Sequence, residues 1–240
     1  MELNIQQQPS GETVKDLITQ NPARIKFFNQ KNIDYSWGAD QSIAKVLANQ
    51  GYDRDVFFAE MGQFEAENKD LILPLLPLDL QNLSVPKLLD NIQGMHHFPE
   101  RKLLFEIDKF LNKIMQVHFD HHGEVLMKLH DQFADLKKEL EVHLVKEDEL
   151  YFPAIRLALE TKAVTPELIA NFKDLEEDHK IVGEIIHEIQ TLTDKFTPPA
   201  DACMTYAKTF GLLEELTESL LIHVYKENFI LIDALQRSVN

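Results

Sequence analysis

Apolar residues recur at alternating spacings of three and four along most of the C-terminal two-thirds of the chain. This spacing gathers apolar side chains on one face of an α-helix. The connections between the stretches are short, and short connections between long amphipathic helices predict antiparallel neighbours. The pattern therefore predicts an up-down four-helix bundle over residues 85–240. Its helices are expected at residues 85–118, 122–160, 166–192 and 200–237.

The first part of the chain is patterned differently. Residues 1–67 contain only short helical patterns, one of which stops at Gly51, and too few apolar residues for a large core. They predict a small helical N-terminal domain. Residues 68–84 carry Pro74 and Pro77 in Leu-rich sequence and cannot form one regular helix, so we interpret them as a linker.

Composition agrees with an all-α fold and narrows the possible partners. The chain has only eight glycines in 240 residues, and its 40 acidic against 24 basic residues give a formal net charge of −16. Such a surface repels nucleic acid and anionic lipid, so we expect neither as a partner. No apolar run reaches about 18 residues, so we expect a cytoplasmic protein without a membrane span. The single cysteine, Cys203, excludes an internal disulfide and is interpreted as structural, with a reactive thiol as the less favoured alternative.

Polar side chains occupy positions on the predicted core-facing stripes of three helices. An ionised glutamate at such a position costs several kcal/mol unless it is paired or bound to a metal ion. The stripe of the second helix is expected to continue through Leu150 and Ala154. The polar residues on these stripes are His143, Glu147, His179, His223 and Glu227.

Two of the stripes carry near copies of one motif, His143-Leu-Val-Lys-Glu147 and His223-Val-Tyr-Lys-Glu227. Residues i and i+4 lie on the same helix face, so each motif offers a nitrogen and a carboxylate to one point. A single His-x-x-x-Glu arises easily by chance in this composition, and His96-x-x-x-Glu100 is interpreted as such a case. The repeat is different, because each copy follows a helix with a further candidate histidine. These candidates are His96 or His97 before the first copy and His179 before the second.

Two such helical hairpins, packed with approximate twofold symmetry, would bring four imidazoles and two carboxylates together. If Glu147 and Glu227 both bridge two ions, each ion receives two nitrogens and two oxygens, and an oxo or hydroxo bridge adds a fifth ligand. Nitrogen and oxygen ligands without thiolate, in a bundle core, suit a carboxylate-bridged iron pair. We expect two iron ions, with manganese and zinc as less favoured alternatives. Helical periodicity puts His96 on the apolar stripe and His97 off it, but Pro99 disturbs the register and leaves this ligand open.

Several further motifs at fixed places along the chain accompany the metal-ligand pattern. Together they make the chain resemble the iron–sulfur cluster repair di-iron proteins, the repair of iron centres family, which join a small N-terminal domain to a hemerythrin-like bundle. The ligands that the resemblance implies are His97 rather than His96, then His143, Glu147, His179, His223 and Glu227. The motifs are Gly11-Glu12-Thr13-Val14, Asp34-Tyr35, Leu89-Asp90-Asn91-Ile92, His96-His97, Val117-His118, Tyr151-Phe152-Pro153, Asp178-His179, Pro198-Pro199-Ala200-Asp201-Ala202-Cys203 and Glu227-Asn228.

The resemblance implies a non-haem di-iron protein that helps to restore iron–sulfur clusters damaged by nitric oxide or oxidants, with iron donation as the favoured route. Its partners would be damaged or apo iron–sulfur proteins, with NO or O₂ as small ligands, and a homodimer is one option. Two alternatives stay open: a hemerythrin-like O₂ or NO binder or sensor without repair activity, and an enzyme that reduces NO or peroxide. Whether the protein is an enzyme, and which residues would be catalytic, therefore stays open.

One departure from the family pattern concerns the N-terminal domain. The family usually has two adjacent cysteines after its Asp-Tyr, whereas Asp34-Tyr35 is followed here by Ser36-Trp37. A thiolate acts as nucleophile, metal ligand and redox group, and neither serine nor tryptophan can replace it. Any thiol-dependent step assigned to that domain is therefore in question.

Overall fold

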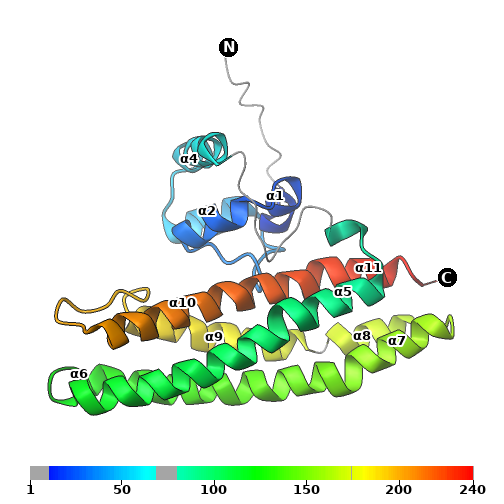
Figure 1. Ribbon diagram of the computed structural model, residues 1–240. Coiled ribbons are helices and arrows are strands. Elements are labelled where there is room, and N and C mark those ends of the chain that lie inside the picture. Colours follow the sequence, from blue (N-terminus) through cyan, green and yellow to red (C-terminus); the bar gives the residue numbers. More distant parts are fainter. Residues whose placement is uncertain (1–10, 69–79, 174, 240) are drawn as a thin grey trace. The chain divides into compact units, whose positions relative to one another are not determined.

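The structure, a computed structural model, describes residues 11–68, 80–173 and 175–239. The chain divides into two compact units, Met1–Asp79 and Leu80–Asn240. Every regular element of the described part is helical, which confirms the predicted all-α class (Figure 1). Most of the predicted linker, residues 69–79, lies outside the described residues. In the described part of the chain, no helix has both the length and the apolar character needed to cross a membrane.

Four helices lie in the described residues 11–68 of the N-terminal unit, and polar caps set where three of them begin. Thr13 and Asp16 form a capping box at the start of the first helix, and the side chains of Ser42 and Asp53 accept backbone N–H bonds at the third and fourth. Such caps satisfy N–H groups that have no partner within the helix. The helices are α1 (Val14–Gln20), α2 (Arg24–Lys31), α3 (Ile43–Gln50) and α4 (Arg54–Glu67).

Aromatic packing and two ion pairs, Arg24–Glu65 and Lys31–Glu60, hold α2 against α4. The rings of Phe27 and Phe57 lie 5.3 Å apart between centroids, and both side chains are buried. The nearly buried Arg24 places Nε 2.7 Å from Glu65 Oε1. This small unit therefore has a core of its own.

The second unit is a bundle of four long helical segments, and Figure 1 shows that neighbouring segments run antiparallel. The first segment joins α5 (Val85–Ile92) through the π-helical turn η2 (Gln93–His97) to the first half of α6 (Phe98–Lys146). The second continues from α6 through the π-helical turn η3 (Glu147–Tyr151) into α7 (Phe152–Glu160). The third and fourth segments comprise α8 (Pro166–Lys173) with α9 (Glu176–Leu192), and α10 (Met204–Tyr225) with the π-helical turn η4 (Lys226–Leu231) and α11 (Ile232–Gln236). A short 3-10 helix, η1 (Leu80–Asn82), precedes them.

Helix α6 supplies two of these segments because it turns back on itself. Its 49 residues would span about 74 Å as a straight helix. Yet Asp108 and Lys137 form an ion pair of 2.7 Å, and His97 and Glu147, at its two ends, lie 3.2 Å apart. Figure 1 shows the reversal at the end of the bundle. The two predicted helices are present, but helical hydrogen bonding continues through the turn between them.

One sequence prediction about the core was wrong. Leu150, expected on the buried stripe, is 64% exposed, and Ala154 is exposed as well, whereas Phe152 and Ile155 are buried. The cause is η3, because a π-helical turn holds more than 3.6 residues and rotates everything after it to a new face. Periodicity read through this turn therefore names the wrong residues.

Candidate metal centre

On three of the four segments, a predicted ligand lies within a π-helical turn. His97 is the last residue of η2, Glu147 is the first of η3, and Glu227 is the second of η4. Pro99 and Pro153 each follow a turn by one residue, and a proline cannot donate the backbone bond that an α-helix needs there. Since π-helical turns are rare and frequently occur at functional sites, their placement marks this level of the bundle.

The first of these turns decides how His96 and His97 are arranged. Both side chains are buried. His97 Nε2 lies 3.2 Å from Glu147 Oε2, whereas His96 Nδ1 lies 3.2 Å from Ser219 Oγ and its ring stacks on His223. The structure thus brings His97, and not His96, to the glutamates. Its role as a ligand stays a prediction.

The six predicted ligands lie in two groups that share both glutamates. Within each group, the donor atoms all lie within 4.8 Å of one another. His97 Nε2 is 3.2 Å from His223 Nε2, and His143 Nε2 is 3.1 Å from His179 Nε2. Both carboxylates belong to both groups, as the bridging arrangement requires. The groups are His97, Glu147, His223 and Glu227, and His143, Glu147, His179 and Glu227.

The two carboxylates of this centre have imidazole nitrogens 3.1–3.4 Å away but almost no hydrogen bonds. Glu147 and Glu227 are fully buried. Neither oxygen of Glu147, and only one of Glu227, takes part in a hydrogen bond with any described residue. A buried carboxylate in this condition costs several kcal/mol. Cations between the carboxylates and the paired imidazole nitrogens would remove this cost, so the donor set fits two metal ions.

Carboxylates lie behind three of the four imidazoles. The Nδ1 atoms of His97 and His223 lie 2.8 Å from Asp148 Oδ1 and 3.0 Å from Glu100 Oε2. His143 Nδ1 lies 3.5 Å from Asp178 Oδ2. An acid in this position holds a proton on Nδ1, fixes the ring and leaves Nε2 free to bind a metal ion.

These three acids were missed as functional residues in the sequence. Glu100, interpreted as part of a chance motif, is fully buried and contacts His223. Asp148 and Asp178 each adjoin a predicted ligand along the chain, and Asp178 also belongs to the family motif Asp178-His179.

Comparison with known proteins places this centre in a family. The Hemerythrin HHE cation binding domain matches residues 89–235, a range that contains all six predicted ligands. The chain belongs to the hemerythrin HHE family. The buried donors described above therefore lie in a cation-binding domain.

Relatives of this hemerythrin HHE protein extend the likeness to nearly the whole chain. The iron–sulfur cluster repair protein YtfE of Enterobacter sp. (strain 638) is 28% identical over 224 residues, which cover 93% of this chain and 94% of that protein. Proteins of the same name from Escherichia coli O81 and Shigella boydii serotype 4 are 27% identical with the same coverage. The resemblance to iron–sulfur cluster repair proteins is confirmed.

Acids and imidazoles of this centre stabilise each other in their charged forms. Burial alone would raise the pKa of Glu227, but His223 and His179 outweigh it and hold this pKa well below its usual range. Burial would likewise lower the pKa of His223, but Glu227 and Glu100 raise it well above its usual value. Lys226 is buried, which lowers its pKa to about 7, and its Nζ donates to Asn91 Oδ1 at 2.8 Å. Glu227 thus stays ionised although it is fully buried.

The only cysteine of this hemerythrin protein is exposed and has a histidine partner. Cys203 lies at the start of α10, with Sγ 3.2 Å from His118 Nε2. This contact, helped by backbone N–H groups at the helix start, lowers the pKa of the Cys203 thiol to about 7. This contact favours the alternative interpretation of Cys203 as a reactive thiol.

We expect Cys203 to react with iodoacetamide at a lower pH than an ordinary cysteine. The thiolate is the nucleophile, so a pKa near 7 places the half-maximal rate near pH 7. His118→Ala should move this midpoint upward, and His130→Ala, a histidine elsewhere on α6, should leave it unchanged. Mass spectrometry of the alkylated protein between pH 5.5 and 9.5 measures the rates. Equal profiles for the wild type and His118→Ala would contradict this expectation.

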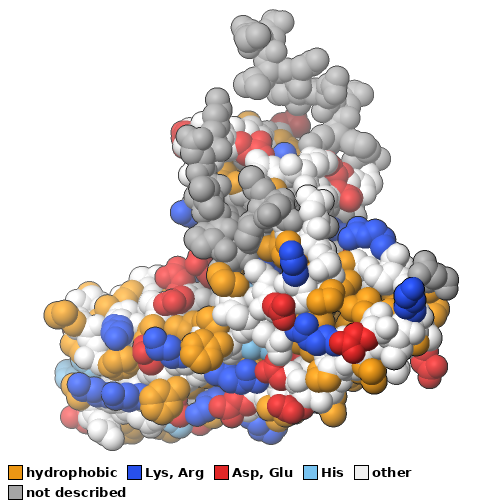
Figure 2. All heavy atoms as spheres, turned by 45° about the vertical axis from the view of Figure 1, so that its right-hand side comes forward, with side chains coloured by type: hydrophobic (Ala, Val, Ile, Leu, Met, Phe, Trp, Pro, Cys, Tyr) orange, Lys and Arg blue, Asp and Glu red, His pale blue; other side chains and the backbone are white. Residues whose placement is uncertain are grey.

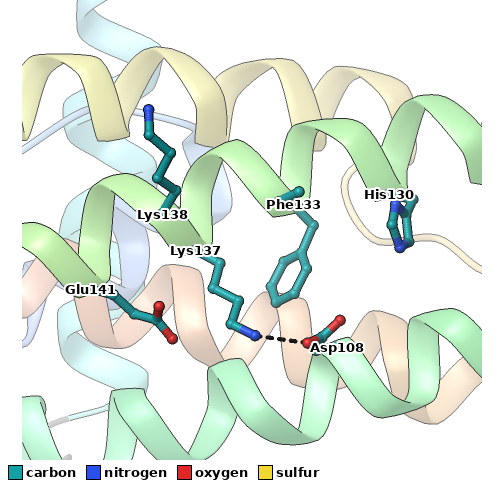
Figure 3. Close-up of a pocket in the computed structure, with 7 residues that line it drawn as sticks. Asp108, His130, Phe133, Lys137, Lys138 and Glu141 are labelled. Atoms are coloured by element: carbon teal, nitrogen blue, oxygen red, sulfur yellow. Dashed lines mark hydrogen bonds and ion pairs between the residues drawn. The ribbon is translucent and has the colours of Figure 1, made fainter.

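A surface pocket of about 210 Å³ lies between the two halves of α6, apart from the predicted ligands (Figure 3). Its lysines are paired, Lys137 with Asp108 at 2.7 Å and Lys138 with Glu139 at 2.8 Å. We assign it no ligand. The pocket is lined by Asp108, His130, Phe133, Ala134, Lys137, Lys138 and Glu141.

Proposed function

We propose that this protein is a di-iron protein that takes part in the repair of iron–sulfur clusters damaged by nitrosative or oxidative stress, and that it supplies iron. The observation that supports this best is the pair of four-donor groups that share Glu147 and Glu227. A pair of iron ions would supply coordination positions open to NO or O₂ and iron that can leave. The relatives named for cluster repair align over both units of the chain, which supports repair as the role of the whole protein.

The ligand assignment is part of this proposal. Each ion would receive two imidazole nitrogens and two carboxylate oxygens, with an oxo or hydroxo bridge between the ions. This donor set suits iron, with manganese and zinc as the alternatives that metal analysis would distinguish. The proposed ligands are His97, His143, Glu147, His179, His223 and Glu227.

The iron would leave the bundle without help from thiols of the N-terminal unit. In place of a cysteine pair, that unit has Ser36 and Trp37, whose backbone N–H groups donate to Asp34 Oδ1 at 2.8 and 2.9 Å. Thiolates bind cluster iron readily, and nitrogen and oxygen ligands compete with them poorly. The cysteines of an apo cluster protein could therefore draw iron from this centre. Such proteins, in the cytoplasm, are the proposed partners.

Iron transfer tests this proposal. The iron-loaded protein, mixed anaerobically with an apo iron–sulfur protein, sulfide and a reductant, should lose iron as the cluster absorption of the partner appears. A chelator that captures free iron, added to the mixture, separates direct transfer from release into solution. Only iron that passes by contact between the two proteins escapes the chelator. The Glu149→Ala variant, changed at an exposed residue of η3, should transfer as the wild type does. Iron that stays on this protein while the partner remains apo would refute iron supply.

The missing cysteine pair favours one alternative, a hemerythrin-like binder of O₂ or NO without repair activity. A binder would show reversible spectral changes with the gas and keep its two irons in the transfer mixture. An enzyme that reduces NO or peroxide would instead consume many equivalents per chain.

A further inference from the structure

The four imidazoles of the centre differ in the acids that contact their Nδ1 atoms. We call the group of His97 and His223 position A, and the group of His143 and His179 position B. Both imidazoles of position A have an acid at Nδ1, at 2.8 and 3.0 Å. In position B, His143 has Asp178 at 3.5 Å, and no described residue forms a hydrogen bond with the buried Nδ1 of His179.

The supporting acids also differ in how strongly their charge acts. Asp148 and Asp178 have side chains that are 18% and 27% exposed, and each pairs with a cation, Arg101 at 2.8 Å and Lys146 at 2.6 Å. Glu100 is fully buried, where a charge is little screened. Its Oε1 accepts a hydrogen bond from Ser219 Oγ at 2.8 Å, while Oε2 faces His223.

An acid behind a metal-binding imidazole makes the opposite nitrogen a stronger ligand and fixes the ring, and removing such a partner typically lowers metal affinity about 10–100-fold. Position A has two such acids, one of them buried. Position B has one, which is more distant and shared with a lysine. The same two bridging glutamates serve both positions, so this difference is what separates them.

We infer that the two metal positions are inequivalent: Glu100, acting through His223, makes position A the tighter site, and the ion at position B is released first. Glu100 is thus a positioning residue. This inference rests on the proposed di-iron centre, and it names the ion that the protein would supply.

Stepwise removal of iron by a colorimetric chelator tests this. The full-length protein is first shown by metal analysis to contain two irons per chain. The wild type should then lose its iron in two phases of about one ion per chain, the second requiring at least about tenfold more chelator or time. Release of both ions in a single phase would overturn the inference.

Variants decide which position belongs to which phase. Glu100→Gln should weaken iron binding at position A about 10–100-fold, so that the second phase moves toward the first or merges with it. Asp178→Asn should weaken only position B and widen the gap between the two phases. Ser219→Ala, which removes the hydroxyl that holds Glu100, should weaken the second phase less, and it serves if Glu100→Gln does not fold. Glu188→Gln, at an exposed acid of α9, should change neither phase. A Glu100→Gln effect confined to the first phase would overturn the inference.

A further control concerns Asp174, which precedes His179 by five residues and lies outside the described residues. Asp174→Asn should leave the first phase unchanged, and a tenfold loss there would reveal an acid that supports position B and remove the basis of the inference. Fewer than two irons per chain at the outset would overturn the di-iron proposal as well. If iron leaves in two phases but none is transferred to an apo cluster protein, only the proposed repair function would be overturned.

Discussion

Replacing Glu147 with alanine is expected to remove both metal ions from the bundle, not one. Glu147 belongs to both four-donor groups, so its loss leaves each position with two imidazoles and a single carboxylate. Removing an outer partner of a ligand already lowers affinity about 10–100-fold. Losing a direct ligand from both positions should cost each ion more, so the variant should be purified with little or no iron.

Elemental analysis of protein from iron-replete cells measures this effect. The matched control is Glu149→Ala, which changes an exposed glutamate in the same π-helical turn and should keep two irons per chain. Circular dichroism establishes that both variants remain helical. If Glu147→Ala retains one ion, Glu147 serves a single position. If it retains both, Glu147 is not a ligand.

Without metal, the double variant Glu147→Leu/Glu227→Leu is expected to be more stable than the wild type. Two buried carboxylates are costly when no cation is present, and replacing buried ionic groups by apolar residues of similar volume often stabilises a protein by about 1–4 kcal/mol. With metal the order should reverse. An ion present at a concentration of about a thousand times its dissociation constant adds about 4 kcal/mol to the free energy of unfolding of a protein that binds it. The wild type gains this stability, whereas the double variant, which lacks the two glutamates, does not.

Denaturant unfolding, followed with and without a chelator, tests this reversal. The sole tryptophan, Trp37, lies in the N-terminal unit and would report that unit, so far-UV circular dichroism should be used to follow the bundle. Glu149→Leu controls for the added apolar side chain. A wild type more stable than the double variant in both conditions would mean that the carboxylates are satisfied by protein groups.

The helical pattern predicted much of the candidate centre because its repeated motif is local. His143 with Glu147, and His223 with Glu227, lie four residues apart, and each pair meets across one helical turn, at 3.4 and 3.1 Å. That distance follows from helix geometry alone. The motif also predicted which helices must face each other, because both copies had to converge on one interior.

What the pattern missed depends on departures from the regular helix and on contacts between helices. Periodicity assumes 3.6 residues per turn, so it placed His97 off the core-facing stripe and Leu150 on it, whereas η2 and η3 rotate both residues. Mid-helix prolines were the only local sign of these turns. The acids behind the imidazoles meet their partners across distances of up to 123 residues in sequence, as Glu100 and His223 do, so no local pattern reveals them.

Several hydrophobic side chains remain exposed on the surface of the bundle, where Figure 2 shows them interspersed with lysine, arginine and acidic side chains. Phe98 and Phe105, on the first half of α6, are among them and are 74% and 69% exposed. Scattered apolar residues of this kind are normal on soluble proteins. We therefore assign them no binding site.

An anomalous difference map, recorded at the iron absorption edge from crystals of the iron-loaded protein, would show most directly whether the bundle holds two iron ions. We expect two peaks inside the bundle, one among His97, His223 and the two glutamates, the other among His143, His179 and the same glutamates. A single peak, or none, with Glu147 and Glu227 turned toward water or paired with lysine, would contradict this expectation.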